Sequence, residues 1–448
     1  MSENRRYVHT DRSSISRNRR TVQSNRNNTG VTARTGRIIS ERNEETAQAD
    51  KDDRNRERVA VQADESEEKR ERMVARSDRI GRKKGRSYFD YSLLFIIIFL
   101  LCFGFVMVYS TTTYSAQASG LASTYYLKKQ IISSCIGLFL MFVIMNIDYR
   151  FWRKLIPLIY VGSIALVFLV LTPLGVTYNG ARRWLSIAGQ SVQPAEFVKV
   201  AVILTCAHII ALNIKYMNRL KAIITTLLFA VFPAGIIAVV TNNLSTAIVV
   251  LGIAGVMVFI ASPNVKEFIG MIALGVGAIA LYLLLGSGFR SERFAAWLHP
   301  EDYASDTAYQ TLQGLYAIGS GGFFGKGLGQ SIQKLGFVPE AENDMIFTII
   351  CEELGLFGGI AIILLFLFMI RRFMIIANNA PDVFGTMIVI GVMAHISLQV
   401  FLNIAVVTNT IPNTGATLPF ISYGGTSIAI LLAEMGLVFS VSKRIKAI

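Results

Sequence analysis

Long apolar stretches separated by short polar segments fill the chain from about residue 89 onward. Each stretch has close to 20 residues, which lets an α-helix cross a hydrocarbon core about 30 Å thick. An outer-membrane barrel is excluded, because its strands are about half as long and alternate between apolar and polar residues. The pattern predicts an all-α polytopic membrane protein with ten transmembrane helices, at Phe89–Tyr109, Gln130–Ile147, Leu155–Leu174, Pro194–Ile214, Ala222–Val240, Leu244–Ile260, Val265–Leu285, Met345–Ile370, Val383–Leu402 and Thr426–Val441.

The Lys and Arg residues near the ends of these stretches predict the orientation, because cytoplasmic connections are enriched in positive charge. With the N-terminal segment inside, the inner connections carry twelve Lys and Arg residues and the outer connections carry eight. We therefore expect both termini to be cytoplasmic. The same arrangement predicts a large outer loop between the seventh and eighth helices, from Arg290 to Asn343.

Charge divides the chain into two regions. Residues 1–86 carry 38 of the 74 charged side chains and have few aromatic residues. Such a composition cannot bury enough apolar surface to fold alone, so we expect a disordered basic cytoplasmic tail before a transmembrane domain of residues 87–448. Basic residues at 79–86 adjoin the first helix and favour contact with membrane lipids. Nucleic acid is not an expected partner, because basic and acidic residues alternate and stacking aromatics are absent.

Carboxylates in the eighth apolar stretch are candidates for chemistry. Asp344 opens this stretch, and Glu352 and Glu353 lie deeper in it. A charge within a membrane helix costs roughly 2.5 to 3.5 kcal/mol, so these residues are expected to have partners or a function. For Asp344, capping of the helix start is an alternative role.

Two further pairs of charged residues lie toward the predicted outer face. Arg182 and Arg183 are outside, against the positive-inside trend, and guanidinium groups suit diphosphate oxygens. Snorkelling at a helix end is the alternative for these arginines. Glu196 and Lys199 are three residues apart on one helix face, which favours a structural ion pair.

The large outer loop has a local pattern of its own. Leu312, Leu315 and Tyr316 have helical spacing, which predicts a short helix at the outer interface. Six glycines follow between Gly319 and Gly329. They lack the spacing of a phosphate-binding loop, so close backbone packing or a flexible hinge is the favoured explanation.

Five segments along the chain match motifs of one known family. In order they carry an arginine pair, a Glu and Lys on a helix, a glycine run, the carboxylate-rich helix start and a Pro-Gly-rich loop. They resemble the SEDS family, the shape, elongation, division and sporulation proteins, at Asn179 to Leu185 (NGARRWL), Gln193 to Lys199 (QPAEFVK), Ala317 to Gly329 (AIGSGGFFGKGLG), Val338 to Gly355 (VPEAENDMIFTIICEELG) and Thr417 to Ser427 (TLPFISYGGTS).

The resemblance implies a ten-helix peptidoglycan glycosyltransferase that polymerises lipid II at the outer face of the bacterial cytoplasmic membrane. It also implies a partner, a class B penicillin-binding protein that crosslinks the glycan. The family's catalytic aspartate matches Asp344. Its substrate-binding residues match Arg182, Arg183, Glu196 and Lys199.

Two motifs depart from the usual family wording. Asn242 to Ser245 stand where many members have Pro-Asp-Leu-Gly, and Glu342 and Asn343 replace the usual His-Thr before the catalytic aspartate. The segment Thr417 to Gly425 resembles the division branch, which implies a location at the division septum and contact with other division proteins. The elongation and sporulation branches, with the same chemistry, are alternatives.

Glycan extension requires a base for the acceptor hydroxyl and a stabiliser for the leaving diphosphate. Asp344 can serve as the base. No cofactor is certain, but Glu340, Glu342 and Asp344 could instead bind Mg²⁺ or Mn²⁺. A lipid II flippase is the alternative function, although charges near one leaflet and the absence of paired broken helices in the sequence favour the transferase.

Overall fold

Nine long apolar helices dominate the part of the chain that the structure describes. The computed structural model describes residues 89–178, 181–187, 190–263, 270, 295–305 and 308–445. Within these ranges nine helices are long and apolar enough to cross a membrane, which confirms a polytopic helical membrane protein. They are α2 (Tyr91–Ala118), α3 (Tyr125–Asn146), α4 (Tyr149–Leu169), α5 (Pro194–Asn213), α6 (Leu220–Val240), α7 (Leu244–Ala261), α11 (Ile346–Asn378), α12 (Val383–Val407) and α13 (Gly425–Ser442).

These nine helices correspond to nine of the predicted spans, and α5, α7 and α12 begin at the residue expected. The seventh predicted span, Val265–Leu285, lies outside the described residues apart from Gly270. The tail of residues 1–86 and Arg290 lie outside them as well. The count of ten helices and the cytoplasmic position of the termini therefore stay predictions.

A small antiparallel sheet between α4 and α5 was not predicted. It has three strands in the order β1 (Gly175–Tyr178), β2 (Ala181–Ile187) and β3 (Gln190–Val192). The expectation of an all-α chain needs this correction. Hydropathy over a 20-residue window cannot detect strands this short, although the Asn179-Gly180 pair in the sequence is typical of a hairpin turn.

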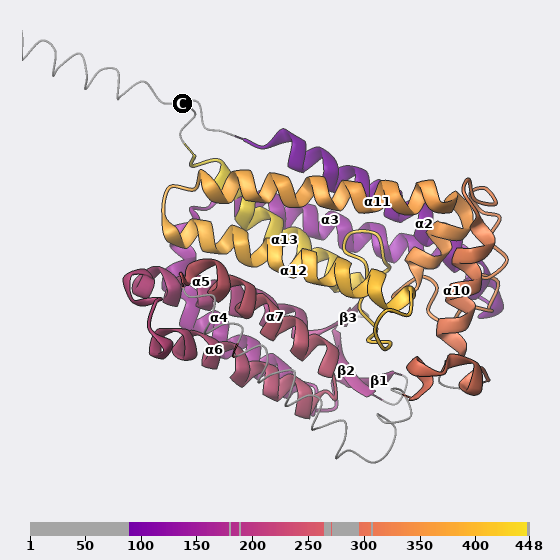
Figure 1. The fold of residues 1–448 in the computed structure, drawn as a ribbon, viewed down its shortest axis with the longest axis horizontal. Helices are drawn as coiled ribbons and strands as arrows, with labels where there is room; N and C mark the ends of the chain where they lie inside the picture. Colours follow the sequence, from indigo (N-terminus) through magenta and orange to yellow (C-terminus); the bar gives the residue numbers. More distant parts are fainter. Residues whose placement is uncertain are drawn as a thin grey trace, which may run out of the picture. The chain divides into compact units, whose positions relative to one another are not determined.

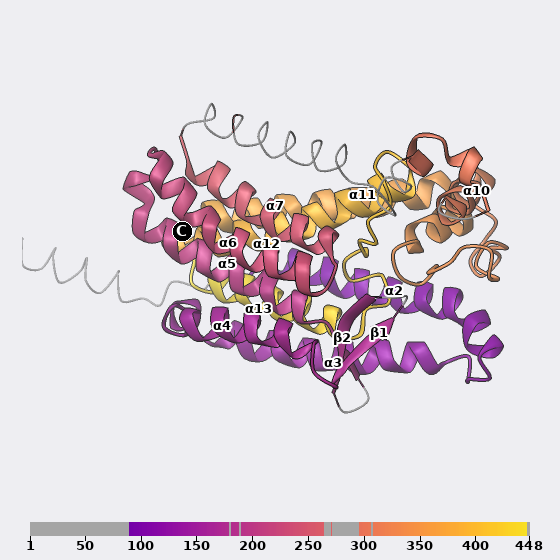
Figure 2. The same ribbon diagram turned by 90° about the horizontal axis from the view of Figure 1, so that it is seen from below.

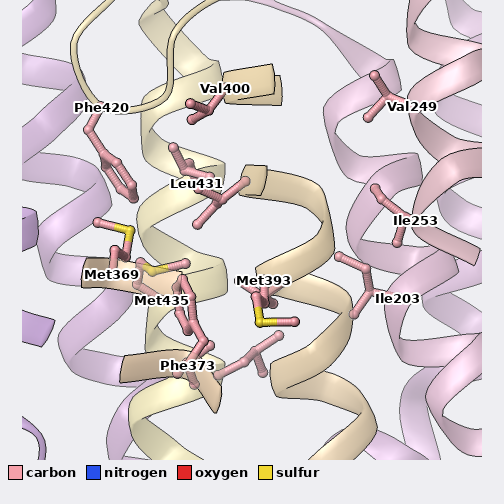
Figure 3. Packing of buried hydrophobic residues seen from close by; sticks show 14 of the residues in the cluster. Ile203, Val249, Ile253, Met369, Phe373, Met393, Val400, Phe420, Leu431 and Met435 are labelled. Atoms are coloured by element: carbon pink, nitrogen blue, oxygen red, sulfur yellow. The ribbon is translucent and has the colours of Figure 1, made fainter. Parts of the chain in front are cut away.

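The helices α12 and α13 are the most buried of the bundle. Figure 1 shows α12 between α11 on one side and α5 and α7 on the other, and it packs against all three. Figure 3 shows buried apolar side chains of this core, among them Ile253, Phe373, Met393 and Met435. Because α12 is surrounded by protein, it can carry polar side chains that would be costly against lipid.

Chain direction places the functional candidates at one end of the bundle. We call the end of the bundle that holds Asp344 the Asp344 end. Four helices finish there, α2, α4, α6 and α12, and five begin there, α3, α5, α7, α11 and α13. The sheet lies at this end beside the start of α13 (Figure 2), where Thr426 Oγ1 donates to the carbonyl of Ser191. The short helix α10 (Tyr309–Gly321) precedes α11 here, which confirms the helix expected around Leu312.

At the opposite end, two aspartates cap helices and also pair with arginines far along the chain. Asp90 accepts a hydrogen bond from the Leu93 N–H at the start of α2 and pairs with Arg372 of α11 at 2.8 Å. Asp148 caps α4 through the Arg150 N–H and pairs with Arg444 at 2.9 Å. Each carboxylate thus satisfies helix N–H groups while joining segments far apart in sequence.

Asp90 is completely buried as a side chain, whereas the side chain of Asp148 is 45% exposed. We expect Asp90→Ala to lower the free energy of unfolding by about 3 kcal/mol, because a cap and a buried ion pair are lost together. The matched variant Asp148→Ala should cost only about 1 kcal/mol, since its ion pair is solvent-screened. Thermal unfolding in detergent measures both. Equal losses in the two variants would contradict this explanation.

Candidate active site

Asp344 lies directly before α11, buried at the Asp344 end of the bundle. Asn403 of α12 holds its backbone, because the Asn403 Nδ2 group donates to the carbonyls of Asp344 at 2.6 Å and Ala416 at 2.8 Å. The Ser422 hydroxyl donates to the Asn343 carbonyl at 2.6 Å. The segment that carries the candidate base is therefore fixed by α12 and by the loop of residues 417–425.

The carboxyl group of Asp344 has few groups that stabilise its charge. Burial raises its pKa from the ordinary value to about 7, and the negative charge of Glu340 acts in the same direction. A long hydrogen bond from Gln310 Nε2 to Asp344 Oδ1, at 3.4 Å, acts against this rise. A carboxyl that titrates near neutral pH suits a general base.

The neighbouring carboxylates do not form a metal site by themselves. Burial raises the pKa of Glu342, and Glu340 accepts a short hydrogen bond from Asn343 Nδ2. Among the residues that the structure describes, no three His, Cys, Asp or Glu side chains come together as metal ligands. A Mg²⁺ or Mn²⁺ requirement at Glu340, Glu342 and Asp344 stays a prediction.

The two arginines of β2 contact the ends of different helices. Arg182 donates to the carbonyls of Thr172 at 2.6 Å and Gly175 at 3.2 Å, just after α4. Arg183 donates to the carbonyls of Thr241 at 3.2 Å and Asn242 at 2.9 Å, just after α6. Adjacent side chains of a strand point to opposite faces, so the two guanidinium groups contact different segments.

These arginine contacts join β2 to carbonyl groups of the segments that follow α4 and α6. Positive charge near a helix C-terminus is also stabilising. The arginines therefore have a structural role in this conformation. Their binding of a diphosphate is not tested by these contacts and stays a prediction.

Glu196 and Lys199 form the ion pair expected from their spacing. Their charged atoms are 2.8 Å apart, and both side chains are buried in the first turns of α5. Glu196 also lines a small pocket together with Gln399 of α12, Ser422 and Tyr423. This pocket adjoins the segment of Asp344, because the Tyr423 N–H donates to the Glu342 carbonyl.

Glu352 and Glu353 have the partners that their burial requires. Lys326 Nζ lies 2.7 Å from Glu352, and Lys334 Nζ lies 2.8 Å from Glu353. Lys326 lies within the glycine run of the outer loop and Lys334 just after it, so this part of the loop folds against the first turns of α11. Ser110 of α2 donates to Glu353 as well, at 2.8 Å.

The glycines of this loop allow close backbone packing, as the sequence analysis favoured. α11 is broken at Gly355, which has φ +69°. A Cβ on Gly325 would lie 2.2 Å from the Glu353 carbonyl oxygen, and one on Gly321 would lie 2.0 Å from that of Cys351. A hinge is not needed to explain these positions.

Sequence reasoning missed the uncharged polar residues of the site. Gln310, Asn403 and Asn413 have no charge and no motif spacing, so hydropathy gave them no weight. Asn403 had one available signal, because an amide at the end of a long apolar run is unusual in a membrane helix. Gln310 and Asn413 could be found only from the folded structure.

Comparison with known proteins adds family evidence to this geometry. The model of the family described as cell cycle protein, which groups FtsW, RodA and SpoVE, matches residues 91–447. Stage V sporulation protein E of Bacillus subtilis is 38% identical over 355 residues, covering 79% of this chain and 97% of that protein. A probable peptidoglycan glycosyltransferase FtsW of the same organism is 35% identical over 380 residues, covering 81% and 93%.

Solved structures agree with the fold. A chain from a peptidoglycan synthase complex that coordinates polymerization and crosslinking has a TM-score of 0.66 at 25% identity, covering 80% of this chain and 98% of that chain. The rod shape determining protein RodA of Thermus thermophilus, at 24% identity and a TM-score of 0.57, supports the fold alone. The names of the FtsW relatives agree with the predicted class of enzyme, a peptidoglycan glycosyltransferase. The chain therefore belongs to the SEDS family of cell cycle proteins that includes FtsW, RodA and SpoVE.

Proposed function

We propose that Asp344 is the general base of a peptidoglycan glycosyl transfer that polymerises lipid II. The hydroxyl at C4 of the acceptor sugar gives its proton to the Asp344 carboxylate as its oxygen forms a bond to the anomeric carbon of the donor. The bond from that carbon to the lipid diphosphate breaks, and the diphosphate leaves with the electron pair. The observation that carries the proposal is that the Asp344 carboxyl is buried directly before α11 and has its pKa raised to about 7.

Placement of this carboxyl suits a substrate that is anchored in lipid. Asp344 precedes the first turn of α11, so it lies at the end of a membrane helix rather than in its middle. The sugars and diphosphate of lipid II are polar, while its polyprenyl chain is apolar and remains in the bilayer. A base at a helix end can thus meet the sugars without drawing them into the hydrocarbon.

The leaving diphosphate needs positive charge, and we assign this role to Arg182, Arg183 and Lys199, with Glu196 positioning the lysine. Lys199 is paired with Glu196, and both arginines donate to helix carbonyls. To bind the diphosphate directly, these side chains must exchange their present partners for its oxygens. Otherwise their positive charges stabilise the diphosphate from a distance. A divalent cation would supply a second way to neutralise the diphosphate.

A flippase is the competing function. Asp344, Glu196 and the two arginines of β2 all lie at one end of the described helices. A transferase needs its polar groups at one leaflet only, and this arrangement supports it. Formation of glycan polymer separates the two functions directly.

We expect Asp344→Asn to insert and fold normally but to lose polymerisation of lipid II, because the amide cannot accept the hydroxyl proton. The variant and the wild-type chain, each with its class B penicillin-binding protein, would be incubated with lipid II and the products separated on a gel. Parallel reactions with and without a chelator test the divalent cation. Asp302→Asn, an exposed aspartate of the same outer connection, is the matched control and should remain active. Near-normal glycan from Asp344→Asn would refute the base assignment.

The pH dependence follows from the raised pKa of Asp344. Below about pH 7 the carboxyl is protonated and cannot act as a base, and above it the carboxylate is available. We therefore expect kcat/KM for lipid II to fall about tenfold for each pH unit below 7 and to level off above it. A rate that is constant between pH 5.5 and 8, measured at saturating acceptor, would be inconsistent with this base.

Location and partner choice extend the proposal. We propose that the protein acts at the division septum with a class B penicillin-binding protein and other division proteins, which is supported by the relatives named FtsW and by the solved synthase complex. A fluorescent fusion should concentrate at the septum, and depletion should give filamentous cells. Signal along the side wall with round cells would favour the elongation branch, and expression restricted to sporulation would favour the sporulation branch.

A further inference from the structure

A chain of two side-chain amides ends on the carboxyl of Asp344. The Gly415 N–H donates to Asn413 Oδ1 at 3.1 Å, and Asn413 Nδ2 donates to Gln310 Oε1 at 2.9 Å. Gln310 Nε2 then donates to Asp344 Oδ1 at 3.4 Å and to the Pro339 carbonyl at 3.4 Å. These contacts join α10, the connection before α11 and the loop that follows α12.

The backbone groups at the two ends of this row of hydrogen bonds determine which way the side-chain amides point. A backbone N–H can only donate, so Asn413 must turn its oxygen toward Gly415 and its NH₂ group toward Gln310. A backbone carbonyl can only accept, so Gln310 must turn its NH₂ group toward Pro339. The two requirements agree, and they leave one N–H of Gln310 directed at Asp344.

The consequence for Asp344 is a difference between its two oxygens. The hydrogen bond from Gln310 engages Oδ1. Oδ2 lies beside Gly415, where a Cβ would be only 3.6 Å away and where φ is +66°. Gln310 is the side-chain donor to this carboxyl among the described residues, and it engages Oδ1, while a backbone N–H also acts on the carboxyl. Oδ2 has no side-chain donor in this part of the structure, so we expect it to be the oxygen that meets a substrate hydroxyl.

We propose that Gln310 is a positioning residue that holds the Asp344 carboxylate with Oδ2 toward the substrate, and that Asn413 sets the orientation of Gln310. This inference rests on the proposed function of Asp344 as the base. The hydrogen bond is long, as catalytic contacts often are before substrate binds. Neither amide contacts a reacting atom, so both act through Asp344.

The first test replaces the donor. Gln310→Leu keeps most of the side-chain volume but removes the N–H, so the carboxylate can rotate away from its productive position. We expect kcat for lipid II polymerisation by the full chain with its penicillin-binding protein to fall about tenfold while KM changes less than about twofold. Gln313→Leu is the matched control on the same helix. Its side chain has no hydrogen bond to the described residues, and the variant should keep its kcat.

The second test reverses the direction of donation in the hydrogen bonds that link Asn413 to Gln310. In Asn413→Asp one carboxylate oxygen accepts from Gly415, and the other faces Gln310 Oε1. Gln310 must then either rotate its oxygen toward Asp344 or tolerate a contact between two acceptors, and its donation to Asp344 is lost or weakened. We expect kcat to fall about as much as in Gln310→Leu, with thermal unfolding unchanged within about 2 °C.

The double variant Gln310→Leu/Asn413→Asp distinguishes two explanations for Asn413→Asp. Asn413 could act through Gln310, or the new negative charge could act on Asp344 from a distance. If Asn413 acts through Gln310, the double variant should lose no more activity than either single variant, because the two residues act as one unit. Losses that multiply would show that the new carboxylate acts directly on Asp344 and would overturn the role of Asn413. Single variants that both keep kcat within about twofold would overturn the proposal entirely.

Failure of this inference is distinct from failure of the proposed function. Activity retained in Asp344→Asn refutes the base itself. An inactive Asp344→Asn beside fully active Gln310→Leu and Asn413→Asp refutes only the positioning role. If Gln310→Leu lowers kcat only because less of the protein folds, the kcat of Asn413→Asp decides the question, because that variant conserves the side-chain shape.

Discussion

Backbone groups that leave a helix within a membrane must find partners inside the protein, and the Asp344 end of this bundle depends on that constraint. α11 is interrupted at Gly355, and its freed carbonyls at Glu352 and Glu353 accept the N–H groups of Lys326 and Gly327. In return, the Leu356 N–H donates to the Gly322 carbonyl. An irregular loop can therefore lie along the first turns of a membrane helix with these backbone groups paired to those of the helix.

The same exchange explains why this loop carries lysines. Once the loop lies against α11, Lys326 and Lys334 reach the fully buried carboxylates of Glu352 and Glu353, so that both carboxylates are paired. Each pair is costly to break, because the remaining charge would be buried without a partner. The loop is thereby held against the first turns of α11, the helix that follows Asp344.

Around Asp344 itself the protein uses uncharged amides instead of ions. Asn403 fixes the backbone, and Gln310 reaches the carboxyl through the orientation that Asn413 gives it. A lysine or arginine in the place of Gln310 would hold the carboxylate more strongly but would also lower its pKa. An amide donor positions the group while leaving its pKa near 7, where a base is most useful.

The amino-acid sequence determined the local features of this protein. The length of each apolar run set nine helices, and the three-residue spacing of Glu196 and Lys199 set their ion pair, because both depend only on neighbours along one helix. Motif resemblance also selected Asp344 and the family. Only the tertiary structure decided which polar groups meet, since the partners of Asp90 and of Gln310 lie 282 and 103 residues away. It likewise separated Arg182 from Arg183, because a strand that hydropathy could not detect sends adjacent side chains to opposite faces.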